Sequence, residues 1–261
     1  MLIAITRAIS PSIGQCELEF QRREPIDLPK AEAQHRAYED CLRRFGADVI
    51  SLPAEPEFPD AVFVEDPALV LDEVAVMTRM GAASRRGESA SLARAIERFR
   101  PLRWLEDPAT LEGGDVMRIE RQIFVGASRR SNPAGIAQLS EILRPFGYQV
   151  NAVTVHGCLH LKSACTYLGR DTILMNRAWI DTAPLAEFRA IEVHSDEPGA
   201  ANALTIGDTT IFPAAFPKTA DILEQSGWKL ERLDISELMK AEAALTCSSL
   251  IFDSKIGGAG R

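Results

Sequence analysis

The apolar positions along the chain form an outline that recurs five times. Each copy contains an extended stretch, a loop with polar residues, an apolar strand, a turn and a second apolar strand. The copies cover residues 50–79, 102–128, 150–176, 189–215 and 230–253. The last copy lacks one strand, which the apolar stretch MLIAITRA at 1–8 can supply. A period of this length indicates a repeat architecture.

Short turns and amphipathic helices connect the predicted strands. Turn signals lie at 72–73, 120–121, 169–171 and 207–208. Helical patterns cover 31–46, 89–99, 131–147 and 217–227. The repeating unit is therefore ββαβ. We predict an α/β fold in which five such units form a closed ring, because closure leaves no sheet edge exposed; an open α/β sheet is the alternative.

One polar residue occupies the same place in every copy, just before or within the middle strand. These residues recur at intervals of 42 to 48 along the chain. Units arranged about a pseudo-fivefold axis would bring the five side chains to one central cavity. The five residues are Asp66, Glu112, His160, Asn202 and Cys247.

Cys247 and His160 supply a nucleophile and a proton carrier. On its own, Cys247 would be assigned to the core, since free cysteines are among the most buried residues. Likewise His160 could be a hydrogen-bonded core histidine, and His156 competes with it for the functional role. Their shared repeat position favours chemistry, in which a thiolate attacks an electrophile and an imidazole moves protons.

The acids indicate what the thiolate attacks. Paired carboxylates can perform general acid–base chemistry, as in glycosidases, or hold a planar guanidinium through its fork of N–H donors. A thiol beside an imidazole and two acids favours an amidine or guanidine substrate over a peptide. The segment FPDAVFVEDPALV at 58–70 contributes Asp60, Glu65 and Asp66, and Phe63 is a candidate wall beside the guanidinium. In LEGGD at 111–115, glycines allow the backbone to approach a ligand closely.

Two arginines are candidates for binding an anion. Arg85 and Arg130 each belong to an arginine pair placed between a strand and a helix. Surface salt bridges are the alternative explanation.

Composition excludes several classes of protein. The chain has 261 residues and a net charge of −8, and no basic cluster interrupts that balance, so we expect it to bind neither nucleic acid nor anionic membranes. No apolar run reaches the ~18 residues that a membrane span needs. Five cysteines, an odd number without a CxxC pair, argue against a disulfide scaffold and a structural zinc site and favour a cytoplasmic location.

The motifs together resemble the dimethylarginine dimethylaminohydrolases, members of the guanidine-modifying pentein superfamily. The matching pieces run in order from residue 12 to residue 250: SIGQCEL, FPDAVFVEDPALV, TRMGAASRRGE, LEGGD, IFVGASRRSN, HLKSACTYL, AAN and LTCSSL. The resemblance implies a five-bladed α/β propeller that forms a single domain over 1–261. It implies hydrolysis of Nω-methylated arginines to citrulline and an amine through a covalent cysteine intermediate, without a cofactor or metal.

The resemblance also assigns roles to residues. It implies Cys247 as nucleophile, His160 as general acid and base, and Glu112 as the acid that orients His160. It implies that Glu65 and Asp66 contact the substrate's guanidinium. It implies that Asp60 and the backbones of Leu18 and Ala241 contact the α-amino group, and that Arg85 and Arg130 contact the α-carboxylate.

The chain departs from the family pattern beside the proposed nucleophile. Glu242-Ala243 stands where the family more often has Asp-Gly, and the charged loop 21–27 is expected to lie in a flap over the site. Three alternatives stay open: a hydrolase of arginine or hydroxyarginine, a non-catalytic arginine-binding propeller, and a metal site at Cys247 and His160. A homodimer is possible.

Overall fold

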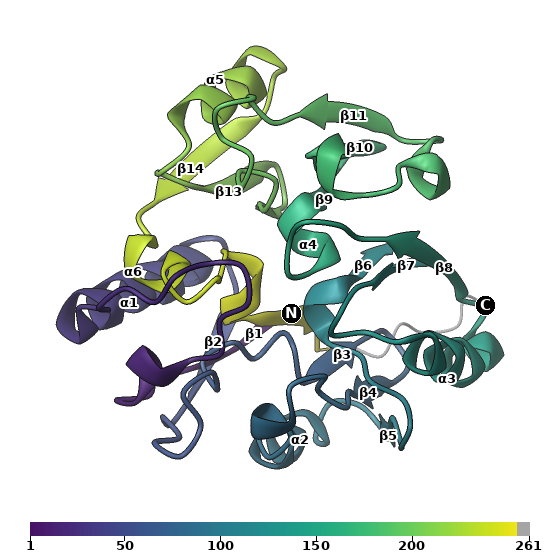
Figure 1. The fold of residues 1–261 in the computed structure, drawn as a ribbon. Coiled ribbons are helices and arrows are strands. Elements are labelled where there is room, and N and C mark those ends of the chain that lie inside the picture. Colours follow the sequence, from purple (N-terminus) through teal and green to yellow (C-terminus); the bar gives the residue numbers. More distant parts are fainter. Residues whose placement is uncertain (255–261) are drawn as a thin grey trace.

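The structure is a computed structural model that describes residues 1–254. The predicted domain extends to residue 261, so its end at 255–261 lies outside the described residues. Five separate sheets of three strands each surround a common axis (Figure 1). The predicted closed ring of five α/β units is therefore confirmed, and the open-sheet alternative is wrong.

Every sheet has the same connectivity. Its first strand pairs antiparallel with the second, and the second pairs parallel with the third. In ring order the strands are β15 (Leu250–Asp253), β1 (Leu2–Arg7) and β2 (Asp48–Leu52); β3 (Ala68–Val70), β4 (Ala75–Met77) and β5 (Leu102–Trp104); β6 (Val116–Ile119), β7 (Gln122–Ala127) and β8 (Gln149–Thr154); β9 (Cys165–Gly169), β10 (Thr172–Met175) and β11 (Arg189–Glu192); β12 (Leu204–Ile206), β13 (Thr209–Pro213) and β14 (Lys229–Leu233).

Helices cross from the second to the third strand on the outside of the ring, as Figure 1 shows. They are α1 (Leu28–Arg44), α2 (Ser89–Ile96), α3 (Pro133–Leu143) and α5 (Pro217–Gln225). The sheet β9–β10–β11 uses two 3₁₀ turns instead, at Arg177–Trp179 and Ala183–Leu185. Two further short helices, α4 (Leu161–Ala164) and α6 (Ser236–Met239), lie elsewhere in the chain. Among the described residues, no helix has the length and apolar character needed to cross a membrane.

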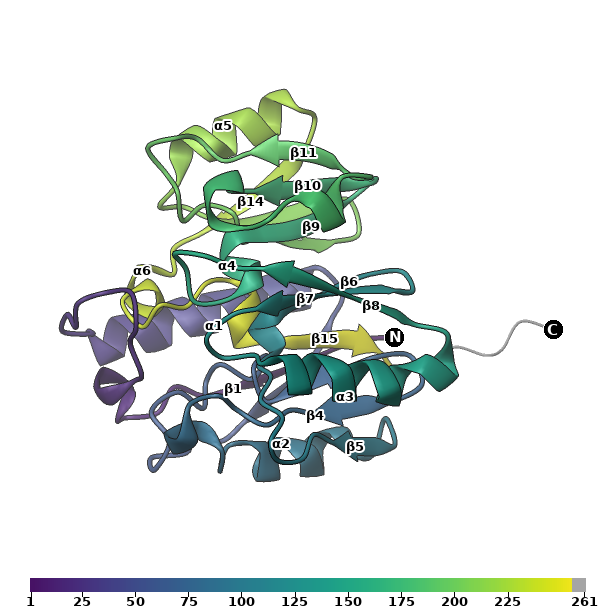
Figure 2. The same cartoon turned by 45° about the vertical axis from the view of Figure 1, so that its right-hand side comes forward.

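The ring closes by pairing the two ends of the described chain. β15 runs antiparallel to β1, with Leu2 opposite Asp253 and Ile3 opposite Phe252. Figure 2 shows the yellow strand β15 in the middle of the molecule, beside the N-terminus. Ile3 and Phe252 are both buried in one apolar cluster. The N-terminal stretch therefore supplies the missing strand, as predicted.

Boundaries differ from the prediction in three places. The extended stretch that opens each predicted copy is the third strand of the preceding sheet, as β5 (Leu102–Trp104) illustrates. Helix α1 begins before residue 31, because the side chain of Asp27 caps it by accepting a hydrogen bond from the Lys30 N–H at 3.1 Å. At the end of the last predicted copy, in ALTCSSLIFD at 244–253, the strand begins only at Leu250, so Cys247 lies in a 3₁₀ turn, Thr246–Ser248.

The five equivalent polar positions precede the first strands β3, β6, β9, β12 and β15. These first strands form the inner wall of the ring, where neighbouring sheets pack against one another. Residues at the same end of adjacent inner strands necessarily face the axis together. This topology, and not proximity in sequence, builds the candidate site.

Candidate active site

Cys247 presents its thiol from the 3₁₀ turn that precedes β15. The backbone fixes this turn, because the Cys247 carbonyl accepts a hydrogen bond from the Glu65 N–H at 3.2 Å. The Ala244 N–H donates to Sγ at 3.4 Å. Burial raises the pKa of the Cys247 thiol well above its ordinary value, and the nearby carboxylates of Glu65 and Asp66 raise it further. A positive charge arriving beside Sγ would reverse this effect and favour the thiolate.

His160 and Glu112 form a buried hydrogen-bonded pair. His160 Nε2 lies 2.7 Å from Glu112 Oε2, and Glu112 is completely shielded from solvent. Burial opposes ionisation of Glu112, but the hydrogen bond and charge of His160 lower its pKa well below the ordinary value. Burial likewise disfavours the imidazolium. The negative charge of Asp66, and the hydrogen bond and charge of Glu112, nevertheless raise the pKa of His160 to about 9. The pair is therefore an imidazolium held against a carboxylate near neutral pH.

The short helix α4 orients His160 from the backbone side. Asp115 accepts a hydrogen bond from the Leu161 N–H at 2.9 Å, while its other oxygen accepts from the hydroxyls of Ser128 and Ser131, each at 2.6 Å. Asp115 ends the LEGGD motif, and the sequence alone predicts no role for it. A buried acid within a glycine-rich turn was the signal that could have identified it.

Gly114 allows the acids and the imidazole to come together. Its N–H donates to Asp66 Oδ1 at 3.1 Å. A Cβ at this position would lie 2.6 Å from His160 Nδ1 and 2.8 Å from Asp66 Oδ1. No larger residue fits without displacing both groups, while the expected approach of the LEGGD backbone to a ligand stays a prediction.

Arg85 is buried among acids. Its Nη1 donates to Asp66 Oδ2 at 2.9 Å, and its Nε donates to Glu88 Oε1 at 3.0 Å. Burial raises the pKa of Glu88 to about 7, against the lowering influence of Arg85. Glu88 went unassigned from the sequence although it ends the quoted SRRGE motif. Salt bridges at this arginine are thus internal, and not on the surface.

Arg130 connects the site to the loop above it. Its Nε donates to Glu19 Oε2 at 3.2 Å, and its Nη1 donates to Glu112 Oε1 at 3.4 Å. Only 8% of the Arg130 surface is exposed. The guanidinium therefore bridges the carboxylate that holds His160 and a carboxylate of the loop.

Most predicted site residues line one cavity of about 20 Å³. Its walls are formed by Glu17, Asp60, Phe63, Asp66, Arg85, Arg130, Leu159, His160, Ala241, Glu242, Ala243 and Cys247. Glu112 lies directly behind His160. The competing histidine, His156, is not part of this wall. Glu17 lies in the matching piece SIGQCEL but has no predicted role, and Leu159 belongs to no motif.

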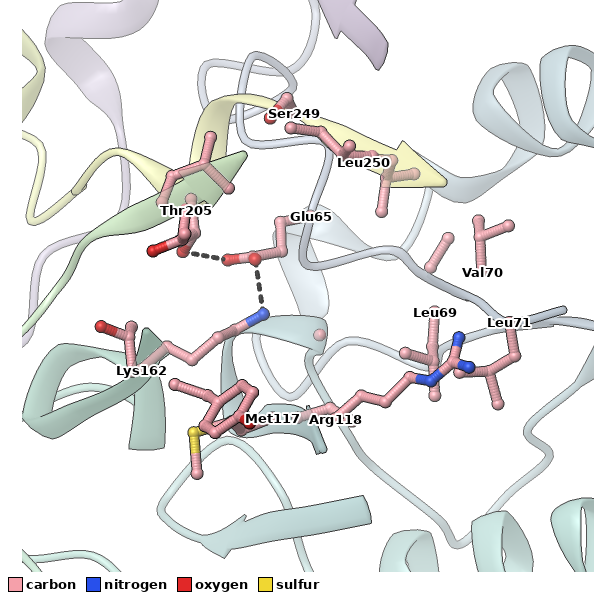
Figure 3. Close-up of a pocket in the computed structure, with 18 of the residues that line it drawn as sticks. Glu65, Leu69, Val70, Leu71, Met117, Arg118, Lys162, Thr205, Ser249 and Leu250 are labelled. Atoms are coloured by element: carbon pink, nitrogen blue, oxygen red, sulfur yellow. Dashed lines mark hydrogen bonds and ion pairs between the residues drawn. The ribbon is translucent and has the colours of Figure 1, made fainter. Parts of the chain in front are cut away.

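Two predicted contacts lie away from this cavity. Leu18 packs against the apolar cluster that includes Ala241 and Ala243. Glu65 lines a second cavity, of about 300 Å³, whose wall contains residues of all five first strands. There its carboxylate pairs with Lys162 and accepts a hydrogen bond from Thr246 Oγ1 at 2.9 Å; Figure 3 shows Lys162 pointing at Glu65. Glu65 thus affects Cys247 in two ways: its charge raises the pKa of the thiol, and its backbone N–H donates to the Cys247 carbonyl.

Asn202, at the fourth equivalent position, braces the turn of Cys247. Its amide accepts from the Thr246 N–H at 3.1 Å and donates to Thr246 Oγ1 at 3.0 Å and to the Lys162 carbonyl at 2.9 Å. It is not in the wall of the smaller cavity. The Asn202 amide therefore holds the Thr246 backbone and hydroxyl and the Lys162 carbonyl.

Asp66, Glu112 and His160 are the group of potential metal donors among the described residues, with one donor atom of each within 4.8 Å of the others. These atoms already have partners. His160 Nε2 bonds to Glu112, and Asp66 accepts from Gly114 and from Arg85. The adjacent guanidinium of Arg85 also repels a cation, so the donor set does not favour a metal.

Comparison with known proteins agrees with the fold. A family model described as arginine deiminase matches residues 55–230. An N(G),N(G)-dimethylarginine dimethylaminohydrolase of Pseudomonas aeruginosa is 35% identical over 87% of this chain and 90% of its own length. One of Streptomyces coelicolor is 36% identical over 95% of both chains.

Solved structures of such enzymes have the same fold. The Pseudomonas aeruginosa enzyme, as a cysteine-to-serine variant complexed with citrulline, matches with a TM-score of 0.91 at 32% identity, covering 95% of this chain and 98% of that chain. A ring of five α/β units whose inner strands present a cysteine, a histidine and acids defines a pentein, the class of guanidine-modifying propellers. Within that class, this chain belongs to the dimethylarginine dimethylaminohydrolase family.

Proposed function

We propose that this protein hydrolyses a guanidinium C–N bond of Nω-methylated arginines and releases citrulline with dimethylamine or methylamine. The observation that carries the proposal is one cavity lined by Cys247, His160 and Asp66, with Glu112 hydrogen-bonded to His160. The relatives support it, since a related structure is an adduct with S-methyl-L-thiocitrulline and another is a complex with citrulline.

Substrate binding activates the nucleophile in this scheme. Asp66 and Glu112 hold the guanidinium planar and charged. The positive charge of the guanidinium offsets the carboxylates that raise the pKa of the Cys247 thiol. The thiol proton passes to solvent as the cation enters. Thiolate formation is thereby coupled to the presence of the correct substrate charge.

The chemistry then proceeds in two balanced stages. Sγ of Cys247 bonds to the central guanidinium carbon, His160 donates a proton to the departing nitrogen, and the C–N bond breaks to give the amine and an S-alkylthiouronium. Neutral His160 next takes a proton from water, the hydroxide adds to the same carbon, and the C–S bond breaks. This returns the thiolate and gives a protonated urea, whose hydroxyl proton passes to solvent to leave citrulline.

The remaining contacts follow from charge and shape. Arg85 and Arg130 are proposed to hold the α-carboxylate, and Asp60, with the backbones of Leu18 and Ala241, the α-amino group. Phe63 is buried in the cavity wall and offers apolar surface to the methyl groups. A cytoplasmic location and a homodimer also stay predictions; all five cysteines are free, which suits a reducing compartment.

A substrate panel tests the proposal. Purified protein is incubated with dimethylarginine, monomethylarginine and arginine, and citrulline and the released amine are quantified. We expect methylated arginines to be the better substrates, and Cys247→Ser to lower kcat by at least about a thousandfold. Cys41→Ala, in the outer helix α1, is the control and should keep the wild-type kcat.

Two results would contradict the proposal. Citrulline formation from arginine that is tenfold faster than from the methylated forms would make the protein an arginine hydrolase. Absence of product from every guanidine, with no adduct on Cys247 by mass spectrometry, would favour a binding protein.

A further inference from the structure

Glu242 holds the loop that covers the site. We call residues 17–23 the flap. The Glu242 carboxylate accepts three consecutive flap N–H groups: those of Phe20 at 2.6 Å and Gln21 at 2.5 Å to Oε1, and that of Glu19 at 3.1 Å to Oε2. Three backbone donors converging on one carboxylate form a nest that fits an anion. The flap tip and Glu242 are thus one hydrogen-bonded unit.

The backbone of Glu242 is shaped for this contact. Its φ of 56° lies in the left-handed region, which a side chain with a Cβ occupies only when its surroundings enforce it. The preceding turn is closed by the Glu242 N–H donating to the Met239 carbonyl at 3.1 Å. This places the carboxylate beneath the flap while Ala241 and Ala243 stay in the cavity wall.

Apolar packing holds the flap mainly at its start, where Leu18 joins the cluster that includes Ala241 and Ala243. Phe20 at its tip is 43% exposed. The other contacts are polar: the Glu17 N–H donates to Asp60 Oδ2 at 3.1 Å, and Glu19 bonds Arg130 Nε at 3.2 Å. Asp60 and Arg130 are the groups proposed to hold the substrate's amino-acid end. Flap position and the geometry of that end are therefore coupled.

Substrate entry requires the flap to move. The cavity of about 20 Å³ has room for about one water molecule, far below the volume of an arginine derivative. Glu17 and Glu242 both form part of its wall. Opening the flap to admit substrate would therefore break its contacts with Glu242.

We propose that Glu242 is a positioning residue, a latch that holds the flap closed over bound substrate. The closed flap then encloses the amino-acid end of the substrate. An aspartate, more usual here in the family, is one methylene shorter. The part of this inference that concerns KM rests on the proposed function; the latch itself does not. Because the latch acts on enclosure and not on the reacting carbon, its loss should raise KM much more than it lowers kcat.

Hydrogen exchange of the full chain measures the latch directly. Glu242→Gly removes the carboxylate while keeping a backbone that favours positive φ. We expect the amides of residues 19–21 to exchange at least tenfold faster in Glu242→Gly, and KM for dimethylarginine to rise about tenfold with kcat within threefold of wild type. Glu242→Gln, which keeps one acceptor oxygen without the charge, should lie between the two and serves if the glycine variant does not fold.

Glu24→Gln is the matched control. It removes one exposed carboxylate close behind the flap, and both exchange and KM should stay at wild-type values. Unchanged exchange of residues 19–21 in Glu242→Gly and Glu242→Gln would overturn the latch. Faster exchange with an unchanged KM would overturn the positioning role. If the wild type turns over no methylated arginine, the proposed function fails, and exchange alone decides the latch.

Discussion

Cys247 is surrounded by charges that keep its thiol protonated until a cation is bound. Glu65 and Asp66 both act in this direction, and burial adds to them. The arrangement limits reaction of the thiol with oxidants or neutral electrophiles, since the thiolate is the reactive form. It also explains how the substrate's own charge could serve as the activator.

Replacing Glu65 tests this electrostatic control. Glu65→Gln removes a carboxylate that raises the pKa of the Cys247 thiol. The ammonium of Lys162, which lowers that pKa, stays nearby, so the pKa falls. We expect iodoacetamide to alkylate Cys247 at least several times faster in this variant at pH 8, with the pH profile moved to lower pH. The other four cysteines are buried, and mass spectrometry assigns the adduct.

The exposed Glu57 provides the comparison, because Glu57→Gln removes equal charge away from the thiol. An alkylation profile for Glu65→Gln that coincides with that of Glu57→Gln would show that Glu65 does not control the thiol.

At this scale the sequence predicted residues through their repeat position. Four residues occupy the same position in their repeats, and the structure brings their side chains together: Cys247, His160, Glu112 and Asp66. Glu242 could not be foreseen, because its partners at the flap tip lie 221 to 223 residues away along the chain. Such contacts depend on how the ring brings distant loops together, which no local pattern records.

Among the elements, short turns present the chemistry. Three-residue 3₁₀ turns at Gly113–Asp115 and Thr246–Ser248, and the start of α4, set Glu112, Cys247 and His160 at the ends of inner strands. Turns this short have no hydrophobic periodicity, so the sequence indicated only loops there. The long amphipathic helices and the paired strands were predictable because their periodic apolar faces pack against the sheets.

Gly114→Ala tests the turn before β6. The added Cβ would lie 2.6 Å from His160 Nδ1, which forces the imidazole away from its position. We expect kcat/KM for dimethylarginine to fall at least about a hundredfold. Gly14→Ala, in another 3₁₀ turn with nothing within 4 Å of the new Cβ, should leave kcat/KM unchanged. Full activity in Gly114→Ala would contradict the close packing described for this turn.

Over the whole molecule, stability depends on closing the ring. β15 joins β1, and the Ser254 N–H donates to the Met1 carbonyl at 2.8 Å. Phe252 of β15 is 7% exposed, and its ring meets that of Phe99 edge-on with centroids 5.3 Å apart. One aromatic side chain therefore packs the last described strand against the segment that follows α2.

Phe252→Ala tests ring closure. We expect it to lower the free energy of unfolding by about 3–5 kcal/mol, because it leaves a cavity where two sheets meet. Urea denaturation measures this. Trp104→Ala, which removes a 47% exposed aromatic from the third strand β5, should change the free energy of unfolding by less than about 0.5 kcal/mol. Equal effects of the two changes would mean that closure through β15 contributes little.

The position of the closing strand in the chain also determines when, during translation, the Cys247 thiol can join the acids and His160. A ribosome makes β1 first among the strands and β15 last, so a nascent chain holds four sheets before the fifth can form. Cys247 lies just ahead of β15, and its turn is bonded to Glu65 and Asn202 of earlier sheets. Until translation reaches this point, the acids and the imidazole lack the thiol of Cys247. Prematurely terminated chains therefore carry no assembled active centre.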